Sequence, residues 1–453
     1  MFDFLDIALE RWVRSSSSKQ GRCVNHIPLW YMRKLSRAKL IHTLRYVYRH
    51  SPGQRKAWND AGIKLRDIRS AEILQHLPLS NGSDLIENPD DYICVPQDEL
   101  IHILTTSSAK GIKKTIYLTA DDFDHQVRTI GTHLRRFAGG ERVAVMFLVH
   151  DPTWTVGSII RQGIAEVGML GFLSGIHRSV KEHIDLIKEY RINRLITSPS
   201  HLGRMTVEAS EDVGKLGIRY IHLGTQPWGE DFRRQMEQKW GAKLIDGYGS
   251  NECVCAIASE CLQQDGLHVA QADLWVEIID PQTGKPLADG QEGEVVVTTL
   301  SRRGMPLVRY RTGDLSHLIP NGQRCACGLP LRKMGRVRGR VDDMLIIGAG
   351  HNLFPDEVDR AVLSVAGISD YQFVLSKEGY KDILELTIEA RGPSEELKAA
   401  VSKALMDVHS IGISCRASQT LRIGGIEIVP PGTLTKDRPK SIRIIDKRTP
   451  AQV

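Results

Sequence analysis

Four hydroxyl groups and one lysine lie in residues 105–111, which read Thr-Thr-Ser-Ser-Ala-Lys-Gly and follow the apolar run 101–104. Lys113 and Lys114 come shortly after this segment. Hydroxyls, backbone N–H groups and ammonium groups gathered at one turn can bind phosphate oxygens. The Walker spacing Gly-x-x-x-x-Gly-Lys-Ser/Thr is absent. Taken alone, an ordinary polar turn is the better explanation of this segment.

An aromatic residue between two glycines, followed by a carboxylate, forms a second candidate site. Residues 246–252 read Asp-Gly-Tyr-Gly-Ser-Asn-Glu and follow a short apolar run. The ring of Tyr248 can lie flat against a planar base, and Glu252 can hold a hard cation through its oxygens. In residues 306–315, Asp314 follows a glycine, and its carboxylate can accept hydrogen bonds from two ribose hydroxyls. A tyrosine packed in the core and an aspartate that caps a turn are the structural alternatives.

The cysteines give a third candidate site. Five of the eight fall within 75 residues, at Cys253, Cys255, Cys261, Cys325 and Cys327. Eight cysteines in a chain of this size do not form a disulfide framework. Cys261, His268, Cys325 and Cys327 offer three thiolates and one imidazole, the ligand set of a closed structural zinc site. The two halves of this set are 56 residues apart, so strands must bring them together, and free core cysteines are an equal alternative. We expect the other two cysteines to line a packed turn.

Short apolar runs alternate with helical patterns between residues 100 and 340, which predicts an α/β unit with a largely parallel sheet. The predicted strands cover residues 101–104, 142–149, 169–173, 194–196, 220–223 and 243–245. Two later runs, 276–279 and 294–298, flank a turn-rich stretch. This arrangement predicts antiparallel strands of a subsidiary sheet or barrel.

Two further regions flank this unit. Residues 1 to about 90 are helix-like, because apolar residues such as Leu40 and Leu44 recur at helical spacing. Residues 343–448 alternate helix and strand again in a smaller unit. The charged, glycine-bearing stretch 339–343 lies where the α/β unit meets this smaller unit. It is a candidate domain boundary, with a solvated loop as the alternative.

Composition excludes several classes of protein. The chain has 453 residues, of which 41% are hydrophobic and 25% charged, as in ordinary globular proteins rather than disordered or fibrous ones. A net charge of +6 is too small to require nucleic acid, and the basic stretch 332–340 lacks the interleaved aromatics of a nucleic-acid surface. Apolar runs such as 143–149 are too short to cross a membrane. The acidic start does not resemble a secretory signal, so we expect a cytoplasmic protein.

Together, and in this order, the motifs at residues 105–111, 246–252 and 306–315 resemble the adenylate-forming superfamily, and most closely its phenylacetate-CoA ligase branch. The similarity continues through residues 339–346 (Gly-Arg-Val-Asp-Asp-Met-Leu-Ile) and 350–355 (Gly-His-Asn-Leu-Phe-Pro). It ends at Lys440 and residues 445–448 (Ile-Asp-Lys-Arg), and so covers roughly residues 30–448. Ordered motifs over such a span are far more specific than a single glycine loop.

The resemblance implies an α/β fold with two domains. The large N-terminal domain, residues 1–341, would hold parallel-rich sheets and the subsidiary β-sheet or barrel, and residues 342–453 would form a small mobile α+β domain. The implied reaction has two steps. A substrate carboxylate attacks the α-phosphate of ATP and pyrophosphate leaves, and a thiol, usually that of CoA, then attacks the acyl adenylate. Cations must surround the site, because two anions approach each other and negative charge moves onto the leaving group.

The resemblance also implies roles for individual residues. Tyr248 corresponds to the adenine-stacking residue, Glu252 to the magnesium ligand and Asp314 to the ribose-binding carboxylate. Lys440 corresponds to a mobile-domain lysine that contacts the carboxylate and the α-phosphate, and Asp342 to the hinge about which that domain swings. The other nucleotide-binding positions are Thr106, Ser107, Ser108, Lys110, Gly111, Gly224, Thr225, Gln226, Pro227, Gly249, Ser250 and Arg340. Some members of the branch carry zinc at similar cysteine and histidine positions, which favours zinc over free cysteines here.

The sequence departs from the family at three places. Residues 106–111 read Thr-Ser-Ser-Ala-Lys-Gly where Ser-Ser-Gly-Thr-Thr-Gly is usual, so contacts to the β- and γ-phosphates should be fewer or different. Lys110 within this loop would supply charge in compensation. Pro439 replaces the usual glycine before Lys440, and Gln226 replaces a common glutamate.

Three hypotheses follow. The first is an aryl or related carboxylate:CoA ligase that uses ATP, Mg²⁺ and CoA, with a structural Zn²⁺. The second is an adenylating ligase that transfers the acyl group to an amine, a hydroxyl or a carrier-protein thiol. The third is a nucleotide-binding homologue that has lost the first half-reaction. Small molecules are the expected partners, not nucleic acid or membranes, and the sequence leaves open whether two copies form a homodimer.

Overall fold

The structure is a computed structural model, and it describes nine segments of the chain. These are residues 29–107, 113–135, 141–146, 156–175, 178–320, 325–329, 331–341, 344–434 and 443–448. Contacts within the chain define two compact units. The first contains residues 1–145, 149–173 and 245–337, and the second contains residues 146–148, 174–244 and 338–453. The expected division into residues 1–341 and 342–453 stays a prediction.

The first unit begins with the predicted helices, α3 (Leu29–His50) and α4 (Pro52–Asp60). Ser51 caps α4 by accepting a hydrogen bond from the backbone of Gln54, and Pro52 occupies the first turn, where its missing N–H costs nothing. The apolar face of α3 is buried against Trp58 and neighbouring residues, as its spacing predicts. The segment continues through short elements: η1 (Leu65–Asp67), η2 (Ala71–His76), α5 (Asp84–Glu87), η3 (Pro89–Tyr92) and η4 (Gln97–Glu99).

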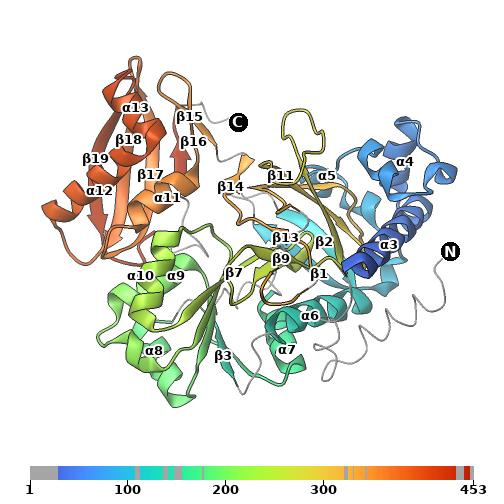
Figure 1. The fold of residues 1–453 in the computed structure, drawn as a ribbon, viewed down its shortest axis with the longest axis horizontal. Coiled ribbons are helices and arrows are strands. Elements are labelled where there is room, and N and C mark those ends of the chain that lie inside the picture. Colours follow the sequence, from blue (N-terminus) through green and yellow to red (C-terminus); the bar gives the residue numbers. More distant parts are fainter. Residues whose placement is uncertain are drawn as a thin grey trace. The chain divides into compact units, whose positions relative to one another are not determined.

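A hairpin and two α/β connections follow. β1 (Leu100–Ser107) and β2 (Lys113–Thr119) are antiparallel. β1 is predicted from the sequence, whereas β2 is not, because the lysines at its start are grouped there with the phosphate loop. β3 (Arg142–Val145) runs parallel to β4 (Leu170–Leu173), as predicted. The helices α6 (Ala120–Arg135) and α7 (Val156–Glu166) lie side by side (Figure 1), and a Cβ at Gly163 would approach Ile130 to 2.6 Å, so only glycine allows this packing.

The rest of the first unit is antiparallel. β7 (Lys243–Ser250) pairs with β8 (Val254–Glu260), β8 with β9 (Leu267–Val269), and β9 with β13 (Lys333–Met334). The predicted subsidiary sheet is confirmed: β10 (Leu274–Ile279), β11 (Gly293–Thr299) and β12 (Tyr310–Ser316) pair antiparallel in sequence order. One buried cluster of side chains from these sheets and from the β1–β2 hairpin forms the core that positions Tyr248 and Tyr310.

The second unit combines a parallel strand pair with the C-terminal elements. β5 (Arg194–Thr197) is parallel to β6 (Tyr220–Leu223). The elements that accompany this pair are α8 (Val180–Glu189), α9 (Pro199–Glu208), η5 (Val213–Leu216) and α10 (Glu230–Trp240). The parallel pairs β3–β4 and β5–β6, together with the antiparallel sheets, confirm the predicted α/β class.

The C-terminal segment has the predicted alternation of helix and strand. Its small elements are β14 (Gly339–Arg340), β15 (Leu345–Ile347), β16 (His351–Leu353) and α11 (Pro355–Leu363). Its main sheet has the order β19–β18–β17–β20, formed by β19 (Leu421–Val429), β18 (Lys381–Ala390), β17 (Ile368–Glu378) and β20 (Ile444–Asp446). α12 (Glu395–Asp407) and α13 (His409–Arg416) pack on each other, and α13 contacts β19 (Figure 1). Among the described residues, no helix combines the length and the apolar character needed to span a bilayer.

Candidate active site

The structure brings together the predicted adenine and ribose residues. Tyr248 lies near the end of β7 and Asp314 in β12, and the Tyr248 hydroxyl donates a hydrogen bond of 2.7 Å to Asp314 Oδ2. Burial, together with the Asp314 carboxylate, raises the pKa of Tyr248 well above its ordinary value. The phenol therefore stays protonated and acts as a donor. Asp314 is only half-buried, so its carboxylate keeps access to further hydroxyl donors.

Local hydrogen bonds fix the backbone around Asp314. Gly313 has a φ of 77°, which favours glycine, and its N–H donates to Glu294 Oε1 at 3.0 Å. The Asp314 N–H donates to Thr312 Oγ1 at 3.1 Å. Glu294 is buried and also accepts from Arg311 Nε at 2.9 Å. The sequence Arg-Thr-Gly-Asp thus forms an irregular stretch of β12, where the register with β11 shifts, and its backbone is held by these hydrogen bonds.

Glu252 lies in a cluster of three polar side chains. Its Oε1 is 2.8 Å from the ammonium nitrogen of Lys114, and the Tyr310 hydroxyl is 3.1 Å from that nitrogen and 3.4 Å from Oε1. The side chains of Lys114 and Glu252 are 17% and 13% exposed, so this ion pair is screened less than a surface pair. The Lys114 ammonium group thus places one positive charge beside Glu252, the residue that is predicted to hold a metal cation. Magnesium commonly binds proteins through one or two carboxylates and completes its shell with phosphate oxygens, so Glu252 fits such an ion.

Tyr310 is a functional candidate that the sequence analysis does not name, and Lys114 is grouped there with the phosphate loop but not with Glu252. Lys114 has a visible signal, because it follows the phosphate loop directly, and Tyr310 stands in the same motif as Asp314. Their partnership with Glu252 joins residues 138 and 58 positions apart, respectively. No local pattern reports contacts over such separations.

The predicted loop 224–227 follows β6 in the second unit. Thr225 has a φ of 75°, a conformation that non-glycine residues rarely adopt and that clusters at functional sites. Gln226 Oε1 accepts a hydrogen bond of 2.8 Å from the hydroxyl of Ser200, at the start of α9. Arg340 lies in β14 of the same unit and is exposed. That these residues share one nucleotide site with Tyr248 and Asp314 stays a prediction.

Several predicted positions lie outside the described residues. They are Ser108, Lys110, Gly111, Asp342 and Lys440. Thr106 and Ser107 form the end of β1, and the structure describes their backbone only. Gly249 and Ser250 complete β7, and Ser250 Oγ accepts a hydrogen bond of 3.2 Å from the N–H of Cys253. Cys253 is fully buried, as expected for a packed turn.

The four predicted zinc ligands meet in the first unit. Cys261 follows β8, His268 lies in β9, and residues 325–327 precede β13, which pairs with β9. One ligand atom from each of the four residues lies within 4.8 Å of every other. The strands thus bring together halves that are 56 residues apart in sequence.

The distances between these ligand atoms fit the tetrahedral coordination of a metal ion. Cys261 Sγ is 3.5 Å from Cys325 Sγ, too long for a disulfide, and Cys327 Sγ is 3.3 Å from His268 Nε2. A tetrahedron with zinc–sulfur bonds of about 2.3 Å has sulfur–sulfur edges of about 3.8 Å. The cluster therefore needs only small adjustments to hold zinc.

The basic stretch 332–340 is largely used in ion pairs within each unit. In the first unit Lys333 Nζ lies 2.8 Å from Asp265, and Arg336 Nε lies 2.8 Å from Asp246 at the start of the tyrosine motif. In the second unit Arg338 Nε lies 3.1 Å from Asp356. These ion pairs link basic side chains of the stretch to carboxylates of the protein itself. Fewer of its positive charges are therefore free to bind a ligand than the count of basic residues in the sequence indicates.

The first unit thus contains a buried tyrosine that is hydrogen-bonded to a partly exposed carboxylate, and a second carboxylate that is paired with a lysine. The model of the AMP-binding enzyme family matches residues 30–301, and the model of the AMP-binding enzyme C-terminal domain matches residues 350–448. The chain belongs to the AMP-binding enzyme family.

Curated relatives and solved structures agree with this assignment. Phenylacetate-coenzyme A ligase of Pseudomonas putida is 29% identical over 428 residues, which cover 90% of this chain and 93% of the relative. The Escherichia coli (strain K12) protein of the same name is 27% identical over 432 residues, covering 92% and 95%. A 2-hydroxyisobutyryl-CoA ligase in its postadenylation state, in complex with R3-HIB-AMP, aligns with a TM-score of 0.77 and 20% identity, over 91% of this chain and 88% of that one. This structural likeness shows a shared fold.

Proposed function

We propose that the chain is an AMP-forming acid:CoA ligase that activates a carboxylic acid, and that the acid is aromatic. In the first step the acid attacks the α-phosphate of ATP and releases pyrophosphate; in the second the thiol of CoA attacks the acyl adenylate and releases AMP. The observation that carries this proposal is the hydrogen bond between Tyr248 and Asp314, with the Glu252–Lys114 pair in the same unit. The phenylacetate-CoA ligases that align over nine-tenths of the chain support the choice of acid and thiol.

Each described residue would contribute to charge control or orientation. The ring of Tyr248 would stack on adenine while Asp314 accepts hydrogen bonds from the ribose hydroxyls. Glu252 would hold Mg²⁺, which supplies positive charge at the phosphates. Lys114 would add a second cation beside it, and Tyr310 keeps that ammonium oriented. Fixed positive charge directed at a negative charge that develops in the transition state is the largest single contribution to rate enhancement in many enzymes.

The C-terminal segment would complete the site in turn. Lys440 is proposed to contact the carboxylate and the α-phosphate during adenylation, and Asp342 to be the hinge for the change between half-reactions. Pro439 would stiffen the loop before the lysine, and Lys110 would replace by charge the hydroxyls that the phosphate loop lacks.

We propose that Cys261, His268, Cys325 and Cys327 bind a structural zinc ion. Three thiolates and one imidazole fill a tetrahedral shell, so no position remains open for substrate. The ion would tie the β8–β9–β13 sheet together at its edge. Its role would be stability, not chemistry.

A second function is favoured by the altered phosphate loop and by the lack of a CoA-specific signal in the sequence. In it, the acyl group of the adenylate is transferred to an amine, a hydroxyl or a carrier-protein thiol, and AMP is released. Product masses with and without CoA separate the two proposals. A third alternative, a nucleotide-binding homologue without the first half-reaction, would be rejected by turnover that disappears in Lys440→Ala.

The experiment that tests the main proposal is ATP–pyrophosphate exchange over a panel of aromatic acids. Acid-dependent exchange is expected, with acyl-CoA formed when CoA is added. ATP binding without exchange for every acid would contradict the proposal. We further propose that the enzyme works in the cytoplasm; the homodimer stays a prediction.

A further inference from the structure

A buried arginine holds the backbone of the turn that carries Glu252. Arg302 lies in the connection between β11 and β12 and is 7% exposed. Its Nη1 donates to the carbonyl oxygen of Glu252 at 2.5 Å, and its Nη2 donates to the carbonyl oxygen of Cys253. One planar guanidinium thus binds two successive carbonyl groups, a geometry that a lysine ammonium cannot reproduce with the same rigidity.

The segment that carries Arg302 is itself fixed, from the side of helix α6. Asp122 accepts hydrogen bonds from the backbone N–H groups of Arg303, at 2.6 Å, and Gly304, at 2.8 Å. A Cβ at Gly304 would lie 2.9 Å from Asp122 Oδ2, so glycine permits this close contact. Asp122 is buried in the first turn of the helix, where a negative charge is favourable.

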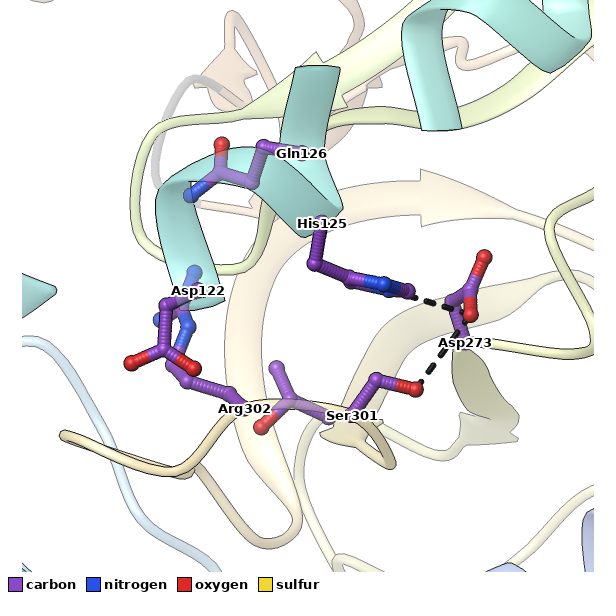
Figure 2. Close-up of a pocket in the computed structure, with 7 residues that line it drawn as sticks. Asp122, His125, Gln126, Asp273, Ser301 and Arg302 are labelled. Atoms are coloured by element: carbon purple, nitrogen blue, oxygen red, sulfur yellow. Dashed lines mark hydrogen bonds and ion pairs between the residues drawn. The ribbon is translucent and has the colours of Figure 1, made fainter. Parts of the chain in front are cut away.

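A second anchor holds the residue before Arg302. Ser301 Oγ donates to Asp273 Oδ1 at 3.3 Å, and the His125 imidazole lies 3.0 Å from the same oxygen (Figure 2). Lys39 Nζ, from α3, donates to Ser301 Oγ at 2.7 Å. Ser301, Asp273 and His125 line a small pocket, partly open to solvent, together with Asp122 and Arg302. Residues of α3 and α6 therefore hold the segment on either side of Arg302.

The turn that Arg302 binds has other supports, and one of them, the hydrogen bond from the Cys253 N–H, acts on the same peptide group as the Glu252 carbonyl that Arg302 binds. Ser250 Oγ accepts from the N–H of Cys253, and Asn251 Nδ2 donates to the carbonyl oxygen of Thr105 at 3.4 Å. Neither contact involves the carbonyl groups of residues 252 and 253. The direction of the Glu252 Cα–Cβ bond depends on the orientation of that peptide, and the Glu252 carboxylate meets Lys114 and Tyr310 only in a narrow range of directions.

We propose that Arg302 is a positioning residue for Glu252: it fixes the peptide so that the carboxylate meets the cation at the nucleotide phosphates. This inference rests on the proposed role of Glu252 as a Mg²⁺ ligand. Residues that orient a metal ligand typically change metal affinity or activity by about 10- to 100-fold when they are replaced. A residue with a purely structural role would change the melting temperature without changing the dependence on metal.

The test measures ATP binding by calorimetry, without acid, in Mg²⁺ and in EDTA. The affinity for ATP in Mg²⁺ divided by the affinity in EDTA reports, for each variant, how strongly metal binding and nucleotide binding are coupled. Arg302→Gln is expected to lower this ratio by about tenfold. Arg302→Lys, which keeps the charge but not the paired donors, should lie between it and the wild type. Arg303→Gln is the matched control, because this neighbouring side chain is 52% exposed, and its ratio should equal that of the wild type.

Two further measurements keep the inference falsifiable. If Arg302→Gln does not fold, Arg302→Lys decides the question, and a wild-type ratio in that variant overturns the inference. A wild-type ratio in a folded Arg302→Gln overturns it as well. Glu252→Gln separates this failure from that of the proposed function: a wild-type ratio there shows that Glu252 does not hold the metal, whereas a lowered ratio there, with no change in the arginine variants, refutes only the role of Arg302.

Discussion

Lowering the pH should destabilise the second unit through two buried histidines. His183 of α8 and His201 of α9 pack edge to face, with ring centroids 4.9 Å apart. His183 Nδ1 lies 2.8 Å from the hydroxyl of Ser174. Burial, and after it the nearby Arg178, lowers the pKa of His183 to about 4. Burial, and after it His183, lowers the pKa of His201 to about 3.

The sign and size of the effect follow from linkage. Between pH 6.5 and 4 the unfolded chain protonates position 183 while the folded chain does not, so stability falls as the pH falls. From pH 7 to pH 5 this difference amounts to about 2 kcal/mol, at about 1.4 kcal/mol per pH unit below the unfolded pKa. The lowered pKa of His201 acts in the same direction, so it also reduces the free energy of unfolding as the pH falls. Since α9 also carries Ser200, which contacts Gln226, the loop 224–227 should lose support together with the helices.

The assay compares wild type with His183→Asn, because an asparagine amide can keep the hydrogen bond to Ser174 and does not titrate. Urea unfolding at pH 7 and pH 5 is followed through Trp228 and Trp240, both buried in this unit. The wild type should lose about 2 kcal/mol more than the variant over this interval. His409→Asn, at an exposed position, is the control and should behave as the wild type. Equal losses in wild type and His183→Asn would refute the reasoning.

Three other changes should have specific outcomes. Asp314→Asn should raise the KM for ATP by about 10- to 100-fold, because it weakens charge-assisted hydrogen bonds to ribose while Tyr248 keeps an acceptor; an unchanged KM in steady-state assays would contradict the ribose assignment. The purified protein should contain one zinc ion per chain, and Cys327→Ser should lose it and melt at a lower temperature; a zinc-free wild type of equal stability would contradict the site. Lys440→Ala should lower adenylation by about 10²- to 10³-fold and slow attack on preformed acyl adenylate less; equal effects on both steps would argue against a lysine specific to adenylation.

Local patterns in the sequence predict much of the fold. The runs at 194–196 and 220–223 become the parallel pair β5–β6, and the subsidiary strands pair antiparallel as their turn-rich connection indicates. Tyr248 and Asp314 could be assigned because each stands in a short motif whose order along the chain is specific. In the structure Tyr248 contacts Asp314 and Cys261 meets Cys325, while the roles that the sequence implies for them stay predictions.

What the sequence does not predict depends on contacts between distant segments. The hydrogen bonds of Arg302 join a surface-like Arg-Arg-Gly stretch to a turn about 50 residues earlier, and its burial is visible only in the fold. Lys114 lies in a strand that was not predicted, and its role depends on a carboxylate 138 residues away. Side-chain periodicity reports which face of an element is buried but not which partner it meets.

The most direct measurement is a mass-spectrometric screen of carboxylic acids incubated with ATP and Mg²⁺, with and without CoA. Our account predicts that at least one aromatic acid gives an acyl adenylate and AMP, and that CoA converts this product to the acyl-CoA. A protein that binds ATP yet gives neither product with any acid in the panel would contradict it.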